Sequence, residues 1–216
     1  MNNLILLIEY HVPQNKARHD EYLECLKKNI KNQYISKIEI FIEADTKPPI
    51  ESSKINYNIV SVRPTFQNLF YFCNKTYPDQ ICIISNSDII FDNTLGVLNQ
   101  DNMKNKFLAL SRRDDSDSVV GGHYSQDVWV FKSPVKIESA NFRMGILGCD
   151  NRISYLASKS GMMVTNPAYQ IRAKHLHKSQ YRTAERESII PGPYLFVVPN
   201  NDINKRSIKR IINRKN

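Results

Sequence analysis

Residues 81–92 read ICIISNSDIIFD, in which an apolar run breaks at a carboxylate. The run from Ile81 to Ile84 predicts a strand buried on both faces, because continuous β-branched runs are typical of parallel sheets covered by helices. In open α/β sheets, ligands bind just beyond the carboxyl ends of the strands. Asp88 falls at that place. The stretch therefore predicts an α/β fold with a site at the end of this strand.

The polar residues after this strand are candidate ligands of a cation. Asn86, Ser87 and Asp88 offer side-chain oxygens on a tight connection. A divalent cation such as Mg²⁺ or Mn²⁺ takes one or two protein carboxylates and shares its other positions with water and phosphates. One aspartate is enough to suggest a metal-diphosphate site, although the same residues also make an ordinary polar turn.

The rest of the chain alternates between strand and helix patterns. Apolar runs predict strands at residues 4–8, 38–42, 55–62, 107–110, 127–132, 162–164 and 171–177. Apolar residues at helical spacing predict helices over residues 18–30, after Thr65, and over residues 152–160. This order is typical of a doubly wound sheet. We expect a single α/β domain over residues 1–202, with a Rossmann-like, mostly parallel central sheet flanked by helices.

Composition excludes several classes of protein. Hydrophobic residues make up 41% and charged residues 24% of the 216 residues, which argues against wholesale disorder. No apolar stretch approaches the roughly 18 residues of a membrane span, and the start of the chain has no basic region of a signal peptide. The four cysteines are scattered and form no Cys-x-x-Cys pair, which argues against a zinc ribbon or a disulfide scaffold. We expect a cytoplasmic protein.

The net charge of +9 is concentrated at the C-terminus, where six cations follow Asp202 without a compensating acid. Residues 203–216 are therefore predicted to form a separate basic tail. Ile208, Ile211 and Ile212 have helical spacing, which suits peripheral contact with an anionic membrane. A nucleic-acid binder would explain the tail alone, and the acids at the strand ends would repel a polyanion, so no nucleic-acid partner is expected.

Five short motifs follow one another along the chain: SNSDIIF at 85–91, ALSRRD at 109–114, SQDVW at 125–129, GCDNR at 148–152 and HLH at 175–177. Together they resemble the A-type (GT-A fold) nucleotide-sugar glycosyltransferases, and more narrowly a group found in bacteria and large DNA viruses. The resemblance spans residues 4–182. It departs from the family at the metal motif, which is usually Asp-x-Asp and here begins with Asn86.

The resemblance implies a metal-dependent enzyme of glycan biosynthesis. It would transfer a hexose-type sugar from a nucleotide-diphosphate donor, with UDP-sugars favoured, to a hydroxyl of a glycan or another acceptor. Asp88 would hold Mn²⁺ or Mg²⁺, which neutralises the diphosphate. The alternative is an inactive relative that only binds sugar nucleotide or glycan, and Asn86 keeps that alternative open.

The resemblance also implies a nucleotide pocket. Glu9 and Glu43, at the ends of the first two strands, would lie beside the base and the ribose, although both could simply be solvated strand ends. The other donor-binding candidates are Arg63, Asn68, Asn86, Ser87 and Arg112.

His175 and His177 are candidates to complete the metal shell. Their i, i+2 spacing on a strand places both imidazoles on one face. The resemblance favours His177. The alternative is a polar, partly buried face, and a zinc site is disfavoured because no cysteine lies near in sequence.

Asp150 is the candidate general base. In glycosyl transfer the incoming hydroxyl loses a proton as it bonds to the sugar, and a carboxylate facing the acceptor can take that proton. The resemblance places such an acid here in enzymes that invert the anomeric centre. The alternative is that Asp150 is only the N-cap of the helix that it opens.

Three further residues are assigned to a donor-sugar or acceptor pocket: Asp127, Trp129 and Arg113. Trp129 could stack on a sugar ring, although its inward position on an alternating strand equally suits core packing. Arg113, like Arg112, could bind hydroxyls or phosphate through its planar fork.

Overall fold

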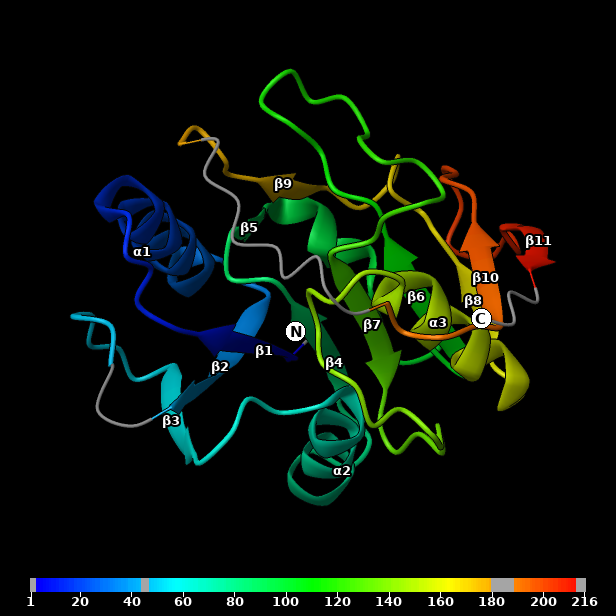
Figure 1. Cartoon of the computed structure of the whole chain (residues 1–216), viewed down its shortest axis with the longest axis horizontal. Coiled ribbons are helices and arrows are strands. Elements are labelled where there is room, and N and C mark those ends of the chain that lie inside the picture. Colours follow the sequence, from blue (N-terminus) through cyan, green and yellow to red (C-terminus); the bar gives the residue numbers. More distant parts are fainter. Residues whose placement is uncertain (1–2, 44–46, 180–188, 213–216) are drawn as a thin grey trace.

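The computed structural model describes residues 3–43, 47–179 and 189–212. Its centre is a seven-stranded sheet with the strand order β3-β2-β1-β4-β7-β6-β8 (Figure 1). Every neighbouring pair is parallel except the two pairs that β7 makes with β4 and β6. The strands are β1 (Leu4–Tyr10), β2 (Ile35–Glu43), β3 (Ile55–Val60), β4 (Ile81–Ser85), β6 (Lys106–Leu110), β7 (Val128–Lys132) and β8 (Met163–Thr165). The predicted α/β class, with a mostly parallel central sheet, is confirmed.

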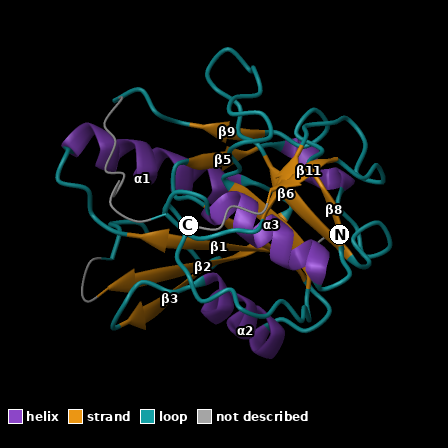
Figure 2. Cartoon of the chain, turned by 45° about the vertical axis from the view of Figure 1, so that its right-hand side comes forward, coloured by secondary structure: helices purple, strands orange, loops and turns teal. Residues whose placement is uncertain are grey.

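Helices cover both faces of the sheet, which is why its central strands are apolar throughout. In β1, Ile5 and Leu7 belong to one hydrophobic cluster and Leu4 and Leu6 to the other. The first cluster includes side chains of α2 (Phe66–Thr76) and α3 (Cys149–Lys159), and the second includes side chains of α1 (Lys16–Lys31). Figure 2 shows α1 and α2 on opposite sides of the strands. The sheet is therefore packed between two hydrophobic layers, one on each face.

A two-stranded sheet next to the main one brings the histidine motif to the end of β4. The second apolar run of the opening stretch forms β5 (Ile89–Phe91), which leaves the main sheet and pairs antiparallel with β9 (Ala173–His175). In this register Ile89 lies opposite His175. Residues separated by more than 80 positions in the sequence thereby become neighbours. A short 3₁₀ helix, η1 (Asn93–Val97), follows β5.

The described part of the predicted basic tail, residues 203–212, packs against the rest of the chain. Ile208–Ile212 forms β11, which pairs antiparallel with β10 (Tyr194–Val197). Ile203 is 3% exposed, and the Ser207 hydroxyl lies 3.1 Å from the Thr165 hydroxyl. Helical spacing of three isoleucines in so short a segment is also compatible with a strand, and the partner strand decides between the two. Contact of this segment with anionic membranes stays a prediction.

Over the described ranges, no helix combines the length and the hydropathy that crossing a bilayer requires.

Candidate functional site at the carboxyl edge of the sheet

Four segments meet at one edge of the sheet. β1, β4 and β6 point the same way, so their carboxyl ends share an edge, and β7 begins there because it runs in the opposite direction. Backbone bonds join the segments beyond the strands: Asn86 N–H donates to the Asp127 carbonyl (3.1 Å), and Asp127 N–H donates to the Leu110 carbonyl (3.2 Å). The predicted motifs after β4 and before β7 are therefore in direct contact.

The structure brings together the three residues predicted as metal ligands. Asp88, His175 and His177 each offer one ligand atom, and these atoms all lie within 4.8 Å of one another. His175 Nε2 is 2.9 Å from Asp88 Oδ2. The two imidazoles are stacked, with ring centroids 5.1 Å apart. The expected same-side placement of the two histidines holds even though β9 ends at His175.

The chemistry of this triad, Asp88 with His175 and His177, suits a divalent cation. Among the described residues, three of its buried polar atoms have no hydrogen-bond partner: Asp88 Oδ1, His177 Nδ1 and His177 Nε2. Burial, followed by the charge of Arg18, lowers the pKa of His177, which favours the neutral form that metal ligation requires. Two imidazoles and one carboxylate are a donor set for divalent first-row metal ions, a series that includes Mn²⁺. The residues present therefore fit such an ion.

Arg18 of α1 contacts the triad and had no place among the predicted site residues. Its Nη2 donates to Asp88 Oδ2, and its Nη1 donates to Glu21 Oε2 (2.8 Å) and to the Leu176 carbonyl (3.0 Å). Burial alone would raise the pKa of Asp88, but its bond to His175 and the charges of His175 and Arg18 outweigh burial and lower it. Asp88 is therefore held ionised.

A signal for Arg18 exists in the sequence. Arg18 lies four and eight residues before Tyr22 and Leu26, on the apolar stripe of the helix, where an arginine needs a buried partner. The partner, Asp88, lies 70 residues away, and no local pattern identifies it.

The second group of acids at this edge is the pair Asp127 and Asp150. Asp127 is bound on both oxygens, by Asn86 Nδ2 (2.8 Å) and by Arg112 Nη1 (2.8 Å). Asp150 Oδ2 accepts from Gln126 N–H (3.3 Å), and its Oδ1 accepts from the thiol of its neighbour in sequence (3.0 Å). Burial and then the charge of Asp127 raise the pKa of Asp150 to about 7. The carboxyl is poised between its two protonation states near neutral pH.

Arg112 links the two groups of acids. Burial would lower its pKa, but the charges of Asp127, Asp88 and Asp150 prevail and raise it. Its side chain is 24% exposed and forms an ion pair with Asp127. The guanidinium therefore interacts electrostatically with acids of both groups, whose segments the backbone bond from Asn86 to Asp127 also joins.

The alternative reading of Asp150 as a helix N-cap is wrong. The N-cap of α3 is Gly148, in the left-handed conformation (φ 87°), and no side chain caps this end. Asp150 lies within the first turn. A carboxylate there is stabilised by the helix dipole, yet its pKa is raised, so burial and the neighbouring Asp127 dominate.

The predicted nucleotide-pocket residues are only partly together. Glu9 Oε2 pairs with Arg63 (2.8 Å), and the Ser87 hydroxyl donates to the Glu9 carbonyl. Burial raises the pKa of Glu9 against the opposing charge of Arg63. Within the described chain, Glu9 Oε1 is buried and has no hydrogen-bond partner, as expected of an acceptor that awaits a ligand. Glu43 ends β2 and is exposed.

Three predicted site residues have structural contacts of their own. Asn68 completes the capping box of α2, with Oδ1 accepting from Thr65 N–H (3.0 Å). Trp129 is 1% exposed and packs edge-on against Phe66, with ring centroids 4.8 Å apart, so its inward position reflects core packing and not sugar stacking. Arg113 is 8% exposed and gives its guanidinium to the backbone carbonyls of Ala168 and Asp117.

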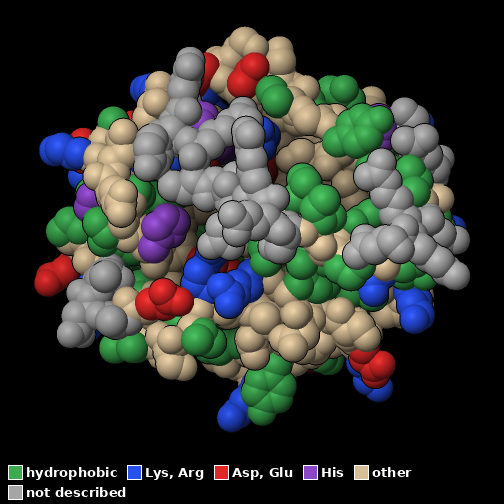
Figure 3. Space-filling view, viewed as in Figure 1, with side chains coloured by type: hydrophobic (Ala, Val, Ile, Leu, Met, Phe, Trp, Pro, Cys, Tyr) green, Lys and Arg blue, Asp and Glu red, His purple; other side chains and the backbone are tan. Residues whose placement is uncertain are grey.

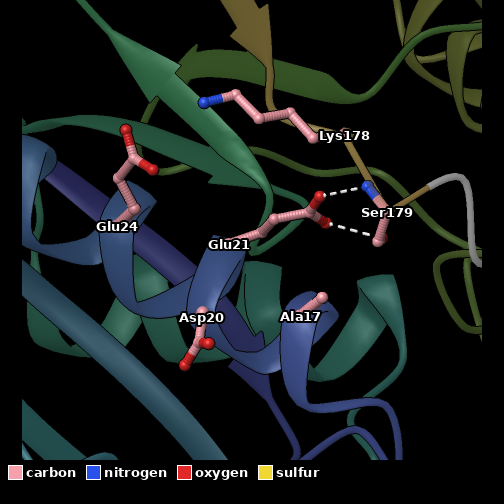
Figure 4. A pocket seen from close by; sticks show the side chains of 6 residues that line it. All are labelled: Ala17, Asp20, Glu21, Glu24, Lys178 and Ser179. Carbon is pink, nitrogen blue, oxygen red and sulfur yellow. Dashed lines mark hydrogen bonds between the residues drawn. The ribbon is translucent and has the colours of Figure 1, made fainter.

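A surface pocket of about 330 Å³ lies between α1 and the residues that follow His177. Its lining residues are Ala17, Asp20, Glu21, Glu24, Lys178 and Ser179 (Figure 4). Glu21 accepts from Ser179 N–H (2.6 Å) and from Arg18 (2.8 Å), and Arg18 in turn contacts Asp88 of the triad. Figure 3 shows acidic, basic and histidine side chains close together on one face of the molecule.

Comparison with known proteins gives no family assignment. No family model matches the chain, and no curated protein matches it. Three similar solved structures are an inositol-1-phosphate CTP transferase from T. maritima, a 4-diphosphocytidyl-2C-methyl-D-erythritol synthase from Anaerococcus prevotii, and a Bacillus anthracis protein assigned as a glucose-1-phosphate thymidylyltransferase, in complex with a sucrose.

Their sequence identities to this chain are 9%, 12% and 13%, and their TM-scores are 0.46, 0.46 and 0.49. The alignments cover 88%, 86% and 77% of this chain and 98%, 94% and 86% of those chains. Likeness at this level carries no argument about the reaction. The α/β class is established by the strand order and direction of the sheet itself.

Proposed function

We propose that the chain is a metal-dependent glycosyltransferase that moves a sugar from a nucleotide-diphosphate donor to a hydroxyl acceptor. The observation that carries the proposal is the pairing of two unlike groups at one sheet edge: the Asp88–His175–His177 triad and the Asp127–Asp150 pair. Transfer from a nucleotide sugar needs a cationic site for the diphosphate and a base for the incoming hydroxyl. The two groups correspond to these two needs.

Asp88, His175 and His177 would hold the cation. When bound, Mn²⁺ or Mg²⁺ would neutralise the diphosphate and stabilise the charge that develops on the leaving nucleotide. The buried atoms of Asp88 and His177 that lack partners among the described residues support this assignment. Arg112 supplies a further cation at the same edge, where it is paired with Asp127, and it stays a candidate for donor binding.

Asp150 would act as general base. The acceptor oxygen forms its bond to the anomeric carbon, the bond from that carbon to the diphosphate breaks, and the hydroxyl proton passes to the Asp150 carboxylate. A base is most effective when its pKa lies near the working pH, and the pKa of Asp150 is about 7. Attack opposite the leaving group inverts the anomeric centre, which is the outcome that we propose.

Glu9 and Arg63 are proposed to contact the nucleoside part of the donor, with UDP-sugars favoured. Oε1 of Glu9, which has no hydrogen-bond partner among the described residues, can accept a hydrogen bond from a base or a ribose hydroxyl. Asn86, which stands in place of the usual first acid of the metal motif, donates to Asp127. Its role is therefore to orient Asp127, and the triad would hold the cation without it.

A thermal-shift panel tests the proposal. UDP-, GDP- and dTDP-sugars are added with and without Mn²⁺, and nucleoside triphosphates form a separate arm. A ligand that binds the folded state raises the melting temperature. We expect a Mn²⁺-dependent rise with one nucleotide-sugar class, which Asp88→Asn removes and the exposed control Asp101→Asn retains.

A shift with triphosphates and none with nucleotide sugars would contradict glycosyl transfer. Slow hydrolysis of the donor by water separates an active enzyme from a relative that only binds. We expect measurable hydrolysis in the wild type with the donor that the panel identifies. Binding without any hydrolysis would favour the inactive alternative.

A further inference from the structure

Arg18 binds the same carboxylate, Asp88, that is proposed to bind the cation. Its Nη2 donates to Asp88 Oδ2, which His175 Nε2 also contacts at 2.9 Å. Asp88 is 5% exposed and Arg18 is 8% exposed. A buried carboxylate needs a cationic or hydrogen-bonding partner to remain ionised. In this structure Arg18 meets that need.

The other half of the guanidinium is anchored independently of Asp88. Arg18 Nη1 donates to Glu21 Oε2 (2.8 Å) and to the Leu176 carbonyl (3.0 Å). The Cζ atom of Arg18 lies 4.8 Å from the centre of the Tyr22 ring. Glu21 is itself fixed by the backbone N–H of Ser179 (2.6 Å). Loss of the contact with Asp88 would therefore leave Arg18 with one carboxylate, one carbonyl and a ring face.

Two cations cannot share this carboxylate without a penalty. A divalent ion on Asp88 would lie within a few ångströms of the guanidinium, in a site where little water screens their repulsion. The neighbouring imidazoles offer no negative charge to offset that repulsion. Either the guanidinium turns away toward Glu21 or the ion binds weakly.

We propose that Arg18 and the divalent cation compete for Asp88, so that Arg18 is a positioning residue that holds the triad in place without metal and lowers its affinity for metal. This inference rests on the metal site of the proposed function. Through Arg18, α1 would regulate metal binding at that site. The ion could replace the Nη2 contact with Asp88 while Nη1 remains bonded to Glu21.

The test is calorimetric titration of Mn²⁺, without any nucleotide, into the wild type and Arg18→Gln. Removing the competing charge should tighten Mn²⁺ binding by about tenfold or more, within the range usual for coupling between two ligands. The matched control is Lys16→Gln, which removes an equal charge from the same helix at a side chain that is 87% exposed. We expect it to change the affinity by less than about twofold.

Thermal unfolding of the same proteins provides the second readout. Arg18→Gln leaves Asp88 and Glu21 buried without their cation, so its melting temperature without metal should fall. Mn²⁺ should restore it and should raise it more than it raises the wild-type value. Asp88→Asn in the Arg18→Gln background should abolish this gain, which shows that the ion binds at Asp88.

The outcomes separate the inference from the function on which it rests. Equal or weaker Mn²⁺ binding by Arg18→Gln, with binding in the wild type intact, overturns the competition and leaves the metal site standing. Absence of Mn²⁺ binding in both proteins overturns the metal site as well. Binding by Arg18→Gln alone supports the competition in its strongest form.

Discussion

Two aspartates at the same edge of one sheet have opposite protonation behaviour. Asp88 is buried beside Arg18 and His175, and its pKa is lowered. Asp150 is half-buried beside Asp127, and its pKa is raised to about 7. Burial acts in the same direction on both, so the neighbouring charge decides the sign.

The difference separates a cation ligand from a proton acceptor. A carboxylate that must bind a metal is useful only when ionised, whereas a base must be able to hold and release a proton near neutral pH. Titratable groups whose environments push their pKa values apart are the expected signature of divided roles in one site. Arg112 interacts electrostatically with both acids.

The largest expected effect comes from removing the charge at Asp88. Asp88→Asn should weaken Mn²⁺ binding by more than about 100-fold, because loss of even an outer-shell partner of a metal ligand typically costs about 10–100-fold. Asn is preferred to Ala as the test, since Ala would also leave Arg18 buried beside an empty space. Mn²⁺ calorimetry measures the change, and undiminished binding would contradict the assignment.

Asp150→Asn should affect chemistry without affecting binding. Turnover should fall by roughly 10²-fold or more, the scale expected for a lost general base, while the affinities for donor and Mn²⁺ stay near wild type. Because Gly148 caps α3, a role in capping no longer competes as an explanation. The control is Glu138→Gln, at an exposed acid near the opposite end of α3. Wild-type turnover in Asp150→Asn would move the role of base to Asp127.

The two aspartates should also contribute to stability with opposite pH dependence. The raised pKa of Asp150 means that the folded chain holds a proton there which the unfolded chain loses above about pH 4, so its contribution to stability is lost as pH rises toward 7. Asp150→Asn should therefore gain stability over the wild type across that window, by a few kcal/mol at most. Denaturant unfolding between pH 4 and pH 8 measures the difference. A gap between the two proteins that is independent of pH would show that the carboxyl does not titrate as described.

The smallest effect is expected at Arg112. Its charge lowers the pKa of Asp150 against burial and Asp127, so Arg112→Gln should raise the midpoint of the pH–turnover profile by about one unit or less. Mn²⁺ affinity should change little, because Arg18 and His175 dominate the environment of Asp88. A large loss of Mn²⁺ affinity with an unchanged midpoint would reverse the proposed division between the two acids.

The sequence was most informative where one local pattern determined the placement of a residue. Apolar runs that end at Asp88 and begin after Asp127 predicted both positions, because strand direction fixes where a strand ends. The i, i+2 spacing of His175 and His177 predicted that they share a side, which the stacked rings confirm.

Placement that depends on contacts between distant segments was missed. The contact of Arg18 with Asp88 exists only once α1 packs beside β5, and the strand at Ile208–Ile212 exists only because β10 is its partner. Trp129 and Arg113 were assigned to a pocket because aromatic and guanidinium groups suit sugars and phosphates. In the structure Trp129 packs against a core side chain, and Arg113 donates to backbone carbonyls. Residue chemistry alone could not distinguish these uses.

The most direct test of the central claim is anomalous diffraction at the manganese edge from crystals soaked with Mn²⁺ and a UDP-sugar. We expect one strong peak in contact with Asp88, His175 and His177, with the diphosphate beside it and the anomeric carbon facing Asp150. A peak in the acidic surface pocket lined by Asp20 and Glu24, with none at the triad, would contradict it.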